Sequence, residues 1–231
     1  MRAISLRCRV RPLEAGDIPQ VLDIERQSFP TMWPQTVYQR ELKNKMARYL
    51  VAYEPAEDGE GADGGAAGVG GLVRRFLGGL PAPAPRERLL GVMGLWCMMG
   101  EAHIVTIAVR EDERRRGLGE LLLAASLEAA MEAGQDVVTL EYRISNQAAR
   151  AMYEKYGFEQ VGVRARYYSD NHEDAVLMTT PPLRSSTFRR LLSRRVAEQH
   201  ERWGEEYPLA GCFGWLAEGA GLRRRVPQGQ A

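Results

Sequence analysis

Apolar positions along the chain follow two spacings, and each spacing predicts one kind of element. Compact apolar runs rich in β-branched residues predict strands, whereas apolar residues that recur every three or four positions predict helices. The predicted strands lie at Val10 and over residues 49–53, 89–99, 103–109, 137–142, 159–167 and 175–179. The predicted helices are one that begins at Asp17, one that ends near Lys45, and two more over 117–133 and 147–156. This order predicts a mixed sheet with helices on its faces, in the α/β (α+β) class.

Capping and turn residues support these boundaries. Asp17 is a suitable N-cap, and Pro19 fits the first turn of the same helix. Ser145 or Asn146 is a suitable cap for the helix that follows them. Gly100 lies in a turn between two apolar runs, which predicts a hairpin buried on both faces.

Two segments depart from this pattern. Residues 55–88 are rich in Gly, Ala and Pro and contain few residues able to build a core, which predicts a loop insertion. After Pro182, apolar residues recur at helical spacing with arginines between them, which predicts a helix that either packs on the domain or binds a partner. We therefore expect one domain over residues 1–182 and a C-terminal helical extension and tail over 183–231.

The composition sets the class of protein and excludes several partners. Of the 231 residues, 45% are hydrophobic and 26% are charged, as in soluble globular proteins. Lys and Arg number 31 against 30 for Asp and Glu, so no overall field attracts nucleic acid or a membrane, and any anion site must be local. The three cysteines are far apart, which predicts neither disulfides nor a metal site. Without a signal peptide or an apolar run long enough to span a bilayer, we expect a cytoplasmic protein.

A basic turn with two glycines lies between a predicted strand and a predicted helix. Backbone N–H groups at a helix N-terminus lack intrahelical partners, and the helix dipole is positive there, so such a turn can bind a pyrophosphate. Glycines permit a positive φ and let phosphate oxygens approach the backbone. The alternative is a basic loop that caps an ordinary helix, but its position after a buried strand favours the phosphate site. The residues of this candidate site are Arg114, Arg115, Arg116, Gly117, Leu118, Gly119 and Glu120.

The order of strand, glycine turn, helix and second strand resembles the GNAT superfamily of N-acetyltransferases, over roughly residues 8–180. The resemblance implies the GNAT fold, a mixed and mostly antiparallel central sheet flanked by helices and splayed between its fourth and fifth strands. It also implies that acetyl-coenzyme A is the co-substrate, and that the backbone of Ile107, Ala108 and Val109 bonds its pantetheine arm like an added strand. The acetyl group and the amine would meet where the sheet splays.

Transfer of an acetyl group from a thioester to an amine requires a neutral amine and a protonated departing thiol. Glu141 is a carboxylate near the C-terminal end of an otherwise apolar strand, and it can accept the amine proton directly or through a water. Tyr153 in the next helix can donate a proton to the thiolate, at a cost of about 2 kcal/mol if both groups have their ordinary pKa values.

The segment 140–158 reads L-E-x-R-x-S-N-x-x-A-x-x-x-Y-x-x-x-G-F, where x marks positions outside the pattern. It closely resembles the RimI-type ribosomal-protein-alanine N-acetyltransferases and the catalytic subunits of N-terminal acetyltransferases. The resemblance makes Glu141 the proton acceptor, Tyr153 the proton donor and Asn146 a contact to coenzyme A. Some N-terminal acetyltransferases have a second base on the strand before the glycine turn, so His103 is either that base or a hydrogen-bonded structural histidine.

Two further segments concern the acceptor of the acetyl group. Tyr167 and Tyr168 resemble the hairpin that closes one side of the peptide site in N-terminal acetyltransferases, and their hydroxyls can bond a peptide backbone. Glu25 and Phe29 would form the other side. We expect a protein N-terminus as substrate, with ribosomal-protein alanine as the first candidate. The alternatives are acetylation of a small amine or a lysine side chain, and a domain that binds acetyl-coenzyme A without turnover.

Overall fold

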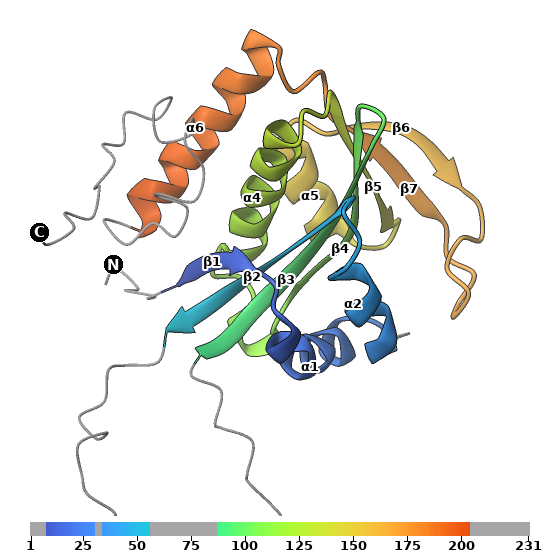
Figure 1. Ribbon diagram of the computed structural model, residues 1–231. Helices are drawn as coiled ribbons and strands as arrows, with labels where there is room; N and C mark the ends of the chain where they lie inside the picture. The colour runs from blue at the N-terminus through green and yellow to red at the C-terminus, as the bar shows by residue number, and fades with distance from the viewer. Residues whose placement is uncertain (1–7, 31–33, 56–86, 204–231) are drawn as a thin grey trace, which may run out of the picture.

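A computed structural model describes residues 8–30, 34–55 and 87–203 of the protein (Figure 1). The strands are β1 (Arg9–Pro12), β2 (Ala47–Pro55), β3 (Glu87–Met98), β4 (Glu101–Val109), β5 (Val137–Arg143), β6 (Glu159–Arg164) and β7 (Ala175–Thr179). The α-helices are α1 (Ile18–Ser28), α2 (Gln35–Glu41), α4 (Leu118–Glu132), α5 (Gln147–Lys155) and α6 (Ser186–Trp203). Short 3₁₀ helices are η1 (Ala15–Asp17) and η2 (Glu111–Glu113).

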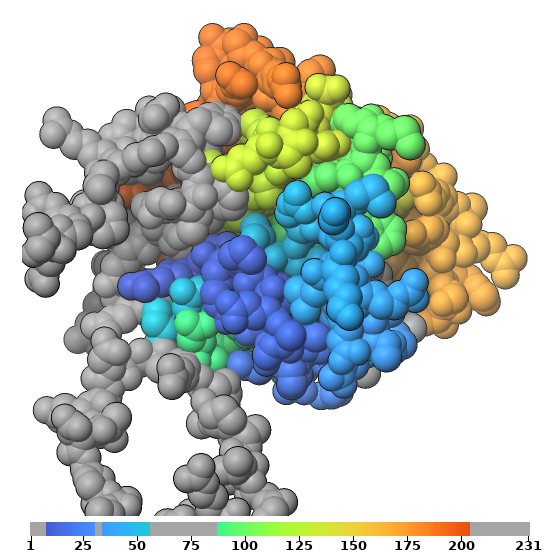
Figure 2. Space-filling view, in the orientation of Figure 1, coloured from blue at the N-terminus to red at the C-terminus, as the bar shows by residue number. Residues whose placement is uncertain are grey.

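The described strands form one seven-stranded mixed sheet with helices on both faces. The strand order is β1-β2-β3-β4-β5-β7-β6, and neighbouring strands are antiparallel except for the parallel pair β4 and β5. α1 and α2 lie on one face, and α4, α5 and α6 lie on the other (Figure 1). The β6–β7 hairpin forms one side of the molecule (Figure 2). The predicted fold class is confirmed.

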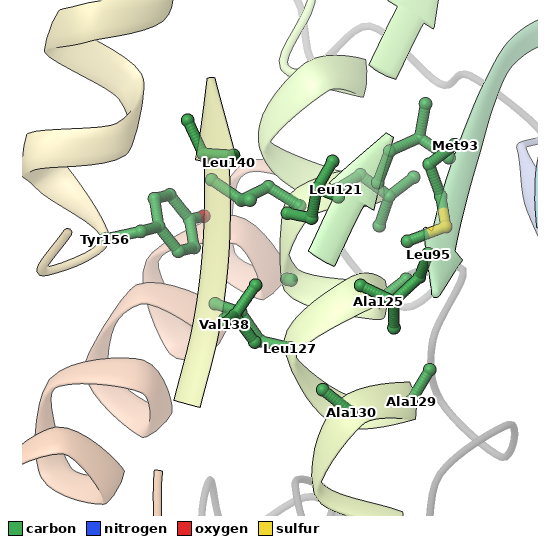
Figure 3. Close-up of a cluster of buried hydrophobic side chains, with 14 of the residues drawn as sticks. Met93, Leu95, Leu121, Ala125, Leu127, Ala129, Ala130, Val138, Leu140 and Tyr156 are labelled. Atoms are coloured by element: carbon green, nitrogen blue, oxygen red, sulfur yellow. The ribbon is translucent and has the colours of Figure 1, made fainter. Parts of the chain in front are cut away.

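Each face of the sheet has its own hydrophobic core. On one face α4 is buried along its whole middle, over residues 121–130, because the sheet covers one side of it and α6 the other. Tyr156, just after α5, closes this core next to β5 (Figure 3). On the other face Val21 and Ile24 of α1 pack with Tyr38 of α2 on β2 and β3. These two cores fix the sheet between its helical layers.

The prediction that the β3–β4 hairpin is buried on both faces is wrong for β4. Ala102 and Ile104 are buried on the face under α4, but His103 and Val105 on the opposite face are only half-buried. The reason is that α4 covers the first face along the strand, whereas α1 covers only part of the second. Alternate side chains of β4 therefore remain accessible near the centre of the sheet.

β4 and β5 separate within the sheet. Their parallel pairing ends at Ile104 and Leu140, while β4 continues to Val109 and β5 continues to Arg143. Along this stretch β4 stays paired with β3, and β5 stays paired with β7. The two halves of the sheet therefore diverge here, which confirms the predicted splay between the fourth and fifth strands.

The predicted N-cap positions of α1 and α5 are confirmed, but only Asn146 caps its helix with its side chain. Asn146 caps α5, because its Oδ1 accepts a hydrogen bond of 3.1 Å from the backbone N–H of Ala149. Asp17 does not cap α1 with its side chain. Its carboxylate instead accepts hydrogen bonds from the guanidinium of Arg11 and from the backbone N–H of Glu14. The chain therefore enters α1 through η1 and not through a side-chain cap.

The predicted strand over 159–167 ends early, at Arg164. Arg166 has a φ of 52°, in the left-handed region, and this conformation turns the chain out of the sheet. The backbone N–H of Arg166 then donates to the carboxylate of Asp174 at 2.7 Å, which closes the turn towards β7. Tyr167 and Tyr168 consequently lie in the connection between β6 and β7.

The structure describes only the ends of the predicted insertion at 55–88. Pro55 closes β2, and Glu87 pairs with it as the first residue of β3. The insertion therefore begins and ends side by side, at one end of the β2–β3 pair. Residues 56–86 lie outside the described residues, as do 31–33 and 204–231.

α6 packs along α4 and next to α5, which is the first of the two alternatives for the C-terminal helix (Figure 1). Phe188, Leu192 and Val196 are its buried residues at helical spacing. Near its C-terminal end, the amide of Gln199 donates a hydrogen bond to the hydroxyl of Tyr156. Among the described residues, every helix is too short or too polar for a membrane span.

We predict that Leu192→Ala destabilises the protein. Leu192 is 1% exposed between α6 and the core, so its truncation should lower the free energy of unfolding by about 2–5 kcal/mol. Urea denaturation followed by circular dichroism measures this value. The matched control is Leu42→Ala, a leucine that is 37% exposed, which should cost about 1 kcal/mol or less. Equal effects of the two substitutions would contradict the packing of α6 described above.

Candidate active site

Glu141 lies in β5 directly after the last residue that pairs with β4. Its neighbours in sequence, Leu140 and Tyr142, point into the core under α4, so Glu141 projects from the opposite face. The Glu141 side chain is only 7% exposed. One carboxylate oxygen lies 3.0 Å from Nε2 of His103 on β4, and the other lies 3.1 Å from a guanidinium nitrogen of Arg164 on β6. Side chains from three strands thus meet at one carboxylate.

His103 belongs to a chain of polar contacts that crosses from β4 to β5. Its Nδ1 lies 2.9 Å from Oγ1 of Thr139, and this hydroxyl donates to the carboxylate of Glu101 at 2.6 Å. Because Thr139 gives its single hydroxyl hydrogen to Glu101, it accepts a hydrogen bond from Nδ1–H of His103. Nε2 of His103 then faces the Glu141 carboxylate at 3.0 Å. Polar contacts therefore link Glu101, Thr139, His103 and Glu141 across the two strands.

The sequence analysis identified Glu141 and named His103, but it missed the other members of this network. Thr139 and Glu101 become neighbours of His103 through the parallel register of β4 and β5. Arg164 reaches Glu141 across β7, from the edge strand β6. The register between two strands cannot be read from the spacing of residues along the chain. No sequence signal could therefore have identified Glu101, Thr139 and Arg164.

Tyr153 lies on α5, on the other face of the sheet from Glu141. It is 7% exposed, and its ring packs against Tyr142 and Phe158 at centroid distances of 5.8 and 5.7 Å. Burial, followed by the nearby Tyr168 and Tyr142, raises the pKa of Tyr153 well above its usual value. Its hydroxyl makes no hydrogen bond with any of the described residues. Tyr153 is therefore a protonated donor at neutral pH, but full proton transfer from it costs more than the sequence analysis expected.

Tyr168 links the environments of the two predicted catalytic residues. Burial, against the opposing charge of Arg143, raises the pKa of Tyr168 to about 12, and the charge of Glu141 adds to the rise. The guanidinium of Arg143 lies over the Tyr168 ring, 3.8 Å from its centroid. Tyr167 is 47% exposed and packs edge-on against Tyr168 at a centroid distance of 5.3 Å. Tyr168 is thus near enough to Glu141 and Tyr153 for their charges to interact. The role of Tyr167 and Tyr168 towards an acceptor stays a prediction.

The β6–β7 connection that carries these tyrosines is fastened to the end of β5. Arg143 pairs with Asp170 at 2.8 Å and with Glu173 at 3.4 Å. The backbone N–H of Ser145 donates to Glu173 at 2.8 Å. Hydrogen bonds from Ser145, with smaller contributions from Asn171 and Arg143, lower the pKa of Glu173 to about 2.

Beyond Ile104, β4 no longer pairs with β5 on that side. The backbone N–H of Arg110 donates to Leu90 on β3, and bonding residues alternate in an antiparallel pair, so Ala108 also bonds β3. Ile107 and Val109 therefore turn their N–H and C=O groups towards the diverging side. This is the edge on which the resemblance places an added strand of pantetheine.

The glycine turn has the backbone conformation that the sequence predicted. Gly117 has a φ of 92°, and it directly precedes α4. A Cβ at Gly119 would lie 3.3 Å from Sδ of Met152 on α5, a tight contact that a side chain at this position would have to relieve. The glycines thus keep the N-terminal backbone of α4 open between two helices, and these residues fit a diphosphate.

The charged residues of the turn are already engaged to different degrees. Arg114 donates to the backbone oxygens of Val109 and Gln27 at 3.2 and 2.9 Å, so it ties the turn to α1. Arg116 pairs with the carboxylate of Glu113. In addition, Lys155 binds Glu120 at 2.6 Å. Arg115 is exposed and has a φ of 66°. Their predicted roles at a phosphate stay predictions.

Glu25 and Phe29 lie at the C-terminal end of α1. Glu25 is 3% exposed, and Oε1 accepts a hydrogen bond of 2.5 Å from the hydroxyl of Tyr38 on α2. Phe29 is half-buried and packs against the core under α1. Both residues are on the face to which Glu141 projects, and Asn146 is exposed at the start of α5. Their roles towards substrate and coenzyme A stay predictions.

A cavity of about 760 Å³ lies away from these residues. It is lined by β1, by Tyr49 and Leu50 of β2, and by Ala129 and Glu132 near the end of α4. None of the predicted site residues lines it. In the part of the chain that the structure describes, no three His, Cys, Asp or Glu side chains gather where they could hold a metal ion.

Comparison with known proteins agrees with this geometry. The family model described as "Acetyltransferase (GNAT) family" matches residues 18–158. A protein of Bacillus subtilis (strain 168), provisionally named a ribosomal protein bS18-alanine N-acetyltransferase, is 31% identical over 173 residues, which cover 74% of this chain and 94% of that protein. An N-alpha-acetyltransferase of Sulfurisphaera tokodaii is 34% identical over 174 residues, which cover 75% of this chain and 92% of that protein.

Among solved structures, the ribosomal-protein-S18-alanine N-acetyltransferase from Escherichia coli has a similar fold. It superposes with a TM-score of 0.57 at 24% sequence identity, and the match covers 76% of this chain and 94% of that one. This likeness supports the fold described above.

We predict that Glu173 stabilises the folded protein in a pH-dependent way. The pKa of Glu173 is about 2 in the folded state, below the ordinary value of about 4.3 that an unfolded chain would show. Ionised Glu173 therefore stabilises the fold fully at a pH above about 4.3, and this stabilisation is lost as the pH falls towards 2. Thermal unfolding should therefore show a lower midpoint for Glu173→Gln than for the wild type at pH 6. This difference should shrink between pH 5 and pH 3.

The control is Glu159→Gln, which replaces an exposed glutamate at the start of β6. A difference for Glu173→Gln that stays constant over the whole pH range would contradict the fastening of the β6–β7 connection.

Proposed function

The chain belongs to the acetyltransferase (GNAT) family and is an acyltransferase, and from this premise we propose that it acetylates the N-terminal amine of a protein with acetyl-coenzyme A as donor. The observation that carries the proposal is the position of Glu141. A buried carboxylate, in contact with a histidine, lies at the point where β4 and β5 diverge. The exposed edge of β4 and the glycine turn lead to the same point.

The backbone of β4 and the turn before α4 would hold the donor. Ile107 offers its N–H and C=O groups, and Val109 offers its N–H group, to the amide-rich pantetheine arm, as one strand does to another. The C=O of Val109 already accepts a hydrogen bond from Arg114. The N–H groups at Gly117 and Gly119 would bind the diphosphate at the start of α4. When bound there, acetyl-coenzyme A supplies the activated thioester.

Glu141 would remove the proton from the attacking amine. An α-amino group has a pKa of about 7.7–8.0, against about 10.4 for lysine, so a modest base such as the Glu141 carboxylate, in contact with His103, suffices for a protein N-terminus. Arg164 holds the second carboxylate oxygen and fixes the orientation of the first. As the amine nitrogen bonds the acetyl carbon, its proton passes to the Glu141–His103 pair.

Tyr153 would assist the departing sulfur. Its hydroxyl is protonated at neutral pH and makes no hydrogen bond with any other described residue, so it can donate to the sulfur as the carbon–sulfur bond breaks. Because burial raises the pKa of Tyr153, the hydrogen bond to the developing thiolate precedes complete transfer of the proton. The proton that Tyr153 gives to sulfur is replaced from solvent.

The tyrosine pair and the named relatives favour a peptide as acceptor. Tyr167 and Tyr168 lie on a fastened connection, and Arg164 contacts both the Tyr167 ring and the Glu141 carboxylate. The two tyrosines can bond a peptide backbone while limiting side-chain size. Two relatives are named for N-terminal acetylation, one of them for the alanine of ribosomal protein bS18. We therefore propose an N-terminal alanine, first of all that of a ribosomal protein.

We predict that Glu141→Gln and Tyr153→Phe each lower kcat by about 10²- to 10⁴-fold, because each substitution removes one proton transfer. The dissociation constant of acetyl-coenzyme A, measured by calorimetry, should stay within about 3-fold of the wild type, because neither side chain holds the nucleotide. Glu154→Gln, an exposed neighbour of Tyr153 on α5, is the control and should keep full activity. Wild-type turnover in both catalytic variants would refute the assigned roles.

A second prediction concerns the acceptor. A peptide that begins with alanine and contains an internal lysine should gain one acetyl group, on its first residue, as located by tandem mass spectrometry. The same peptide with a blocked N-terminus should gain none, because the amine of lysine holds its proton more strongly than an α-amine. Acetylation of a polyamine or of the lysine, with no reaction at the N-terminus, would show that the proposed acceptor is wrong.

A further inference from the structure

The C-terminal end of α6 lies against the glycine turn, although the two are far apart in the sequence. A Cβ at Gly117 would lie 3.2 Å from a terminal guanidinium nitrogen of Arg202 and 3.6 Å from the indole nitrogen of Trp203. Gly117 directly precedes α4, where the first N–H groups of that helix lack intrahelical partners. Two nitrogen donors of α6 thus flank the candidate diphosphate site.

Both donors lack a partner within the described part of the chain. The indole N–H of Trp203 is buried and makes no hydrogen bond there. A buried donor without an acceptor costs roughly 1–3 kcal/mol, so such groups usually mark a missing partner. Arg202 is exposed and forms no ion pair with another described residue. An anion at the turn would supply an acceptor for both.

The turn itself has less available positive charge than its sequence suggests. Arg114 is held by backbone oxygens of Val109 and Gln27, and Arg116 is held by Glu113. A diphosphate at this position would therefore gain from a guanidinium that comes from elsewhere. Arginine suits this role because its planar donors match phosphate oxygens.

The end of α6 is held firmly enough to present these donors. Leu192 and Val196 are buried in the core with α4. The guanidinium of Arg195 donates to the backbone oxygen of Lys155 at 3.1 Å, and Gln199 bonds the hydroxyl of Tyr156. These contacts fix the last two turns of α6 against the C-terminal end of α5. Arg202 and Trp203 continue directly from this anchored segment.

We propose that α6 completes the acetyl-coenzyme A site, with the guanidinium of Arg202 and the indole N–H of Trp203 binding the diphosphate of the nucleotide together with the backbone at Gly117. This inference rests on the proposed function. It makes the C-terminal helix, which lies beyond the part of the chain that matches the family model, a part of the donor site.

Calorimetric titration of the full chain with coenzyme A tests the proposal. Arg202→Ala should weaken binding by about 10-fold, as expected for loss of one charge-assisted hydrogen bond to phosphate. Trp203→Phe keeps a ring and removes the N–H, and it should weaken binding by about 3- to 10-fold. Arg190→Ala, an exposed arginine on the same helix, is the control and should bind like the wild type. Thermal unfolding verifies that all variants are folded.

A second ligand locates the contact. Because the proposed partner is the diphosphate, 3′-dephospho-coenzyme A should show the same relative losses. Losses seen with coenzyme A alone would assign the two side chains to the 3′-phosphate and overturn the proposal. Unchanged or tighter binding by both variants would also overturn it, since tighter binding means that α6 obstructs the turn. Absence of binding by the wild type would instead refute the proposed function itself.

Discussion

The divergence of β4 and β5 is the feature on which the proposed chemistry depends. The parallel pair is bonded as far as Ile104 and Leu140, and beyond these residues each strand keeps only its outer neighbour. Backbone N–H and C=O groups inside a protein need partners, so an interior strand edge that is left open is a template for an extended ligand. In the proposed mechanism, the carboxylate of Glu141 on one face of the sheet and the phenol of Tyr153 on the other would act on the reacting atoms where the strands diverge. Two well-packed cores keep the two halves of the sheet in this arrangement.

Preorganisation is the second physical theme of the site. Glu141 is nearly buried, and partners on β4 and β6 hold both of its oxygens. His103 is oriented in turn by Thr139, whose hydroxyl is committed to Glu101. Groups fixed in this way need little rearrangement when charge develops during the reaction, and this is how a weak base becomes an effective one.

The arrangement of α4, α5 and α6 connects the stability of the protein with its donor site. The three helices share one core, and polar contacts between α5 and α6 fix the end of α6 beside the glycine turn. Loss of packing in α6 would therefore affect more than the free energy of unfolding. It would also shift the donors that flank the first turn of α4. α6 stabilises the fold through its apolar residues. In the proposal, its last two residues also bind the diphosphate of coenzyme A.

The sequence by itself determined most of the elements and the fold class, and it predicted the candidate catalytic residues. Apolar spacing predicts helices and strands because burial on one face repeats with the local geometry. A glycine turn before a helix and a glutamate in an apolar strand are also visible in a short stretch of sequence. Only the tertiary structure decided which distant residues meet. Arg164 reaches Glu141 through the order of β5, β7 and β6, and Arg202 reaches Gly117 through the packing of α6. Strand register and helix docking are set by the whole core, so no short stretch of sequence contains them.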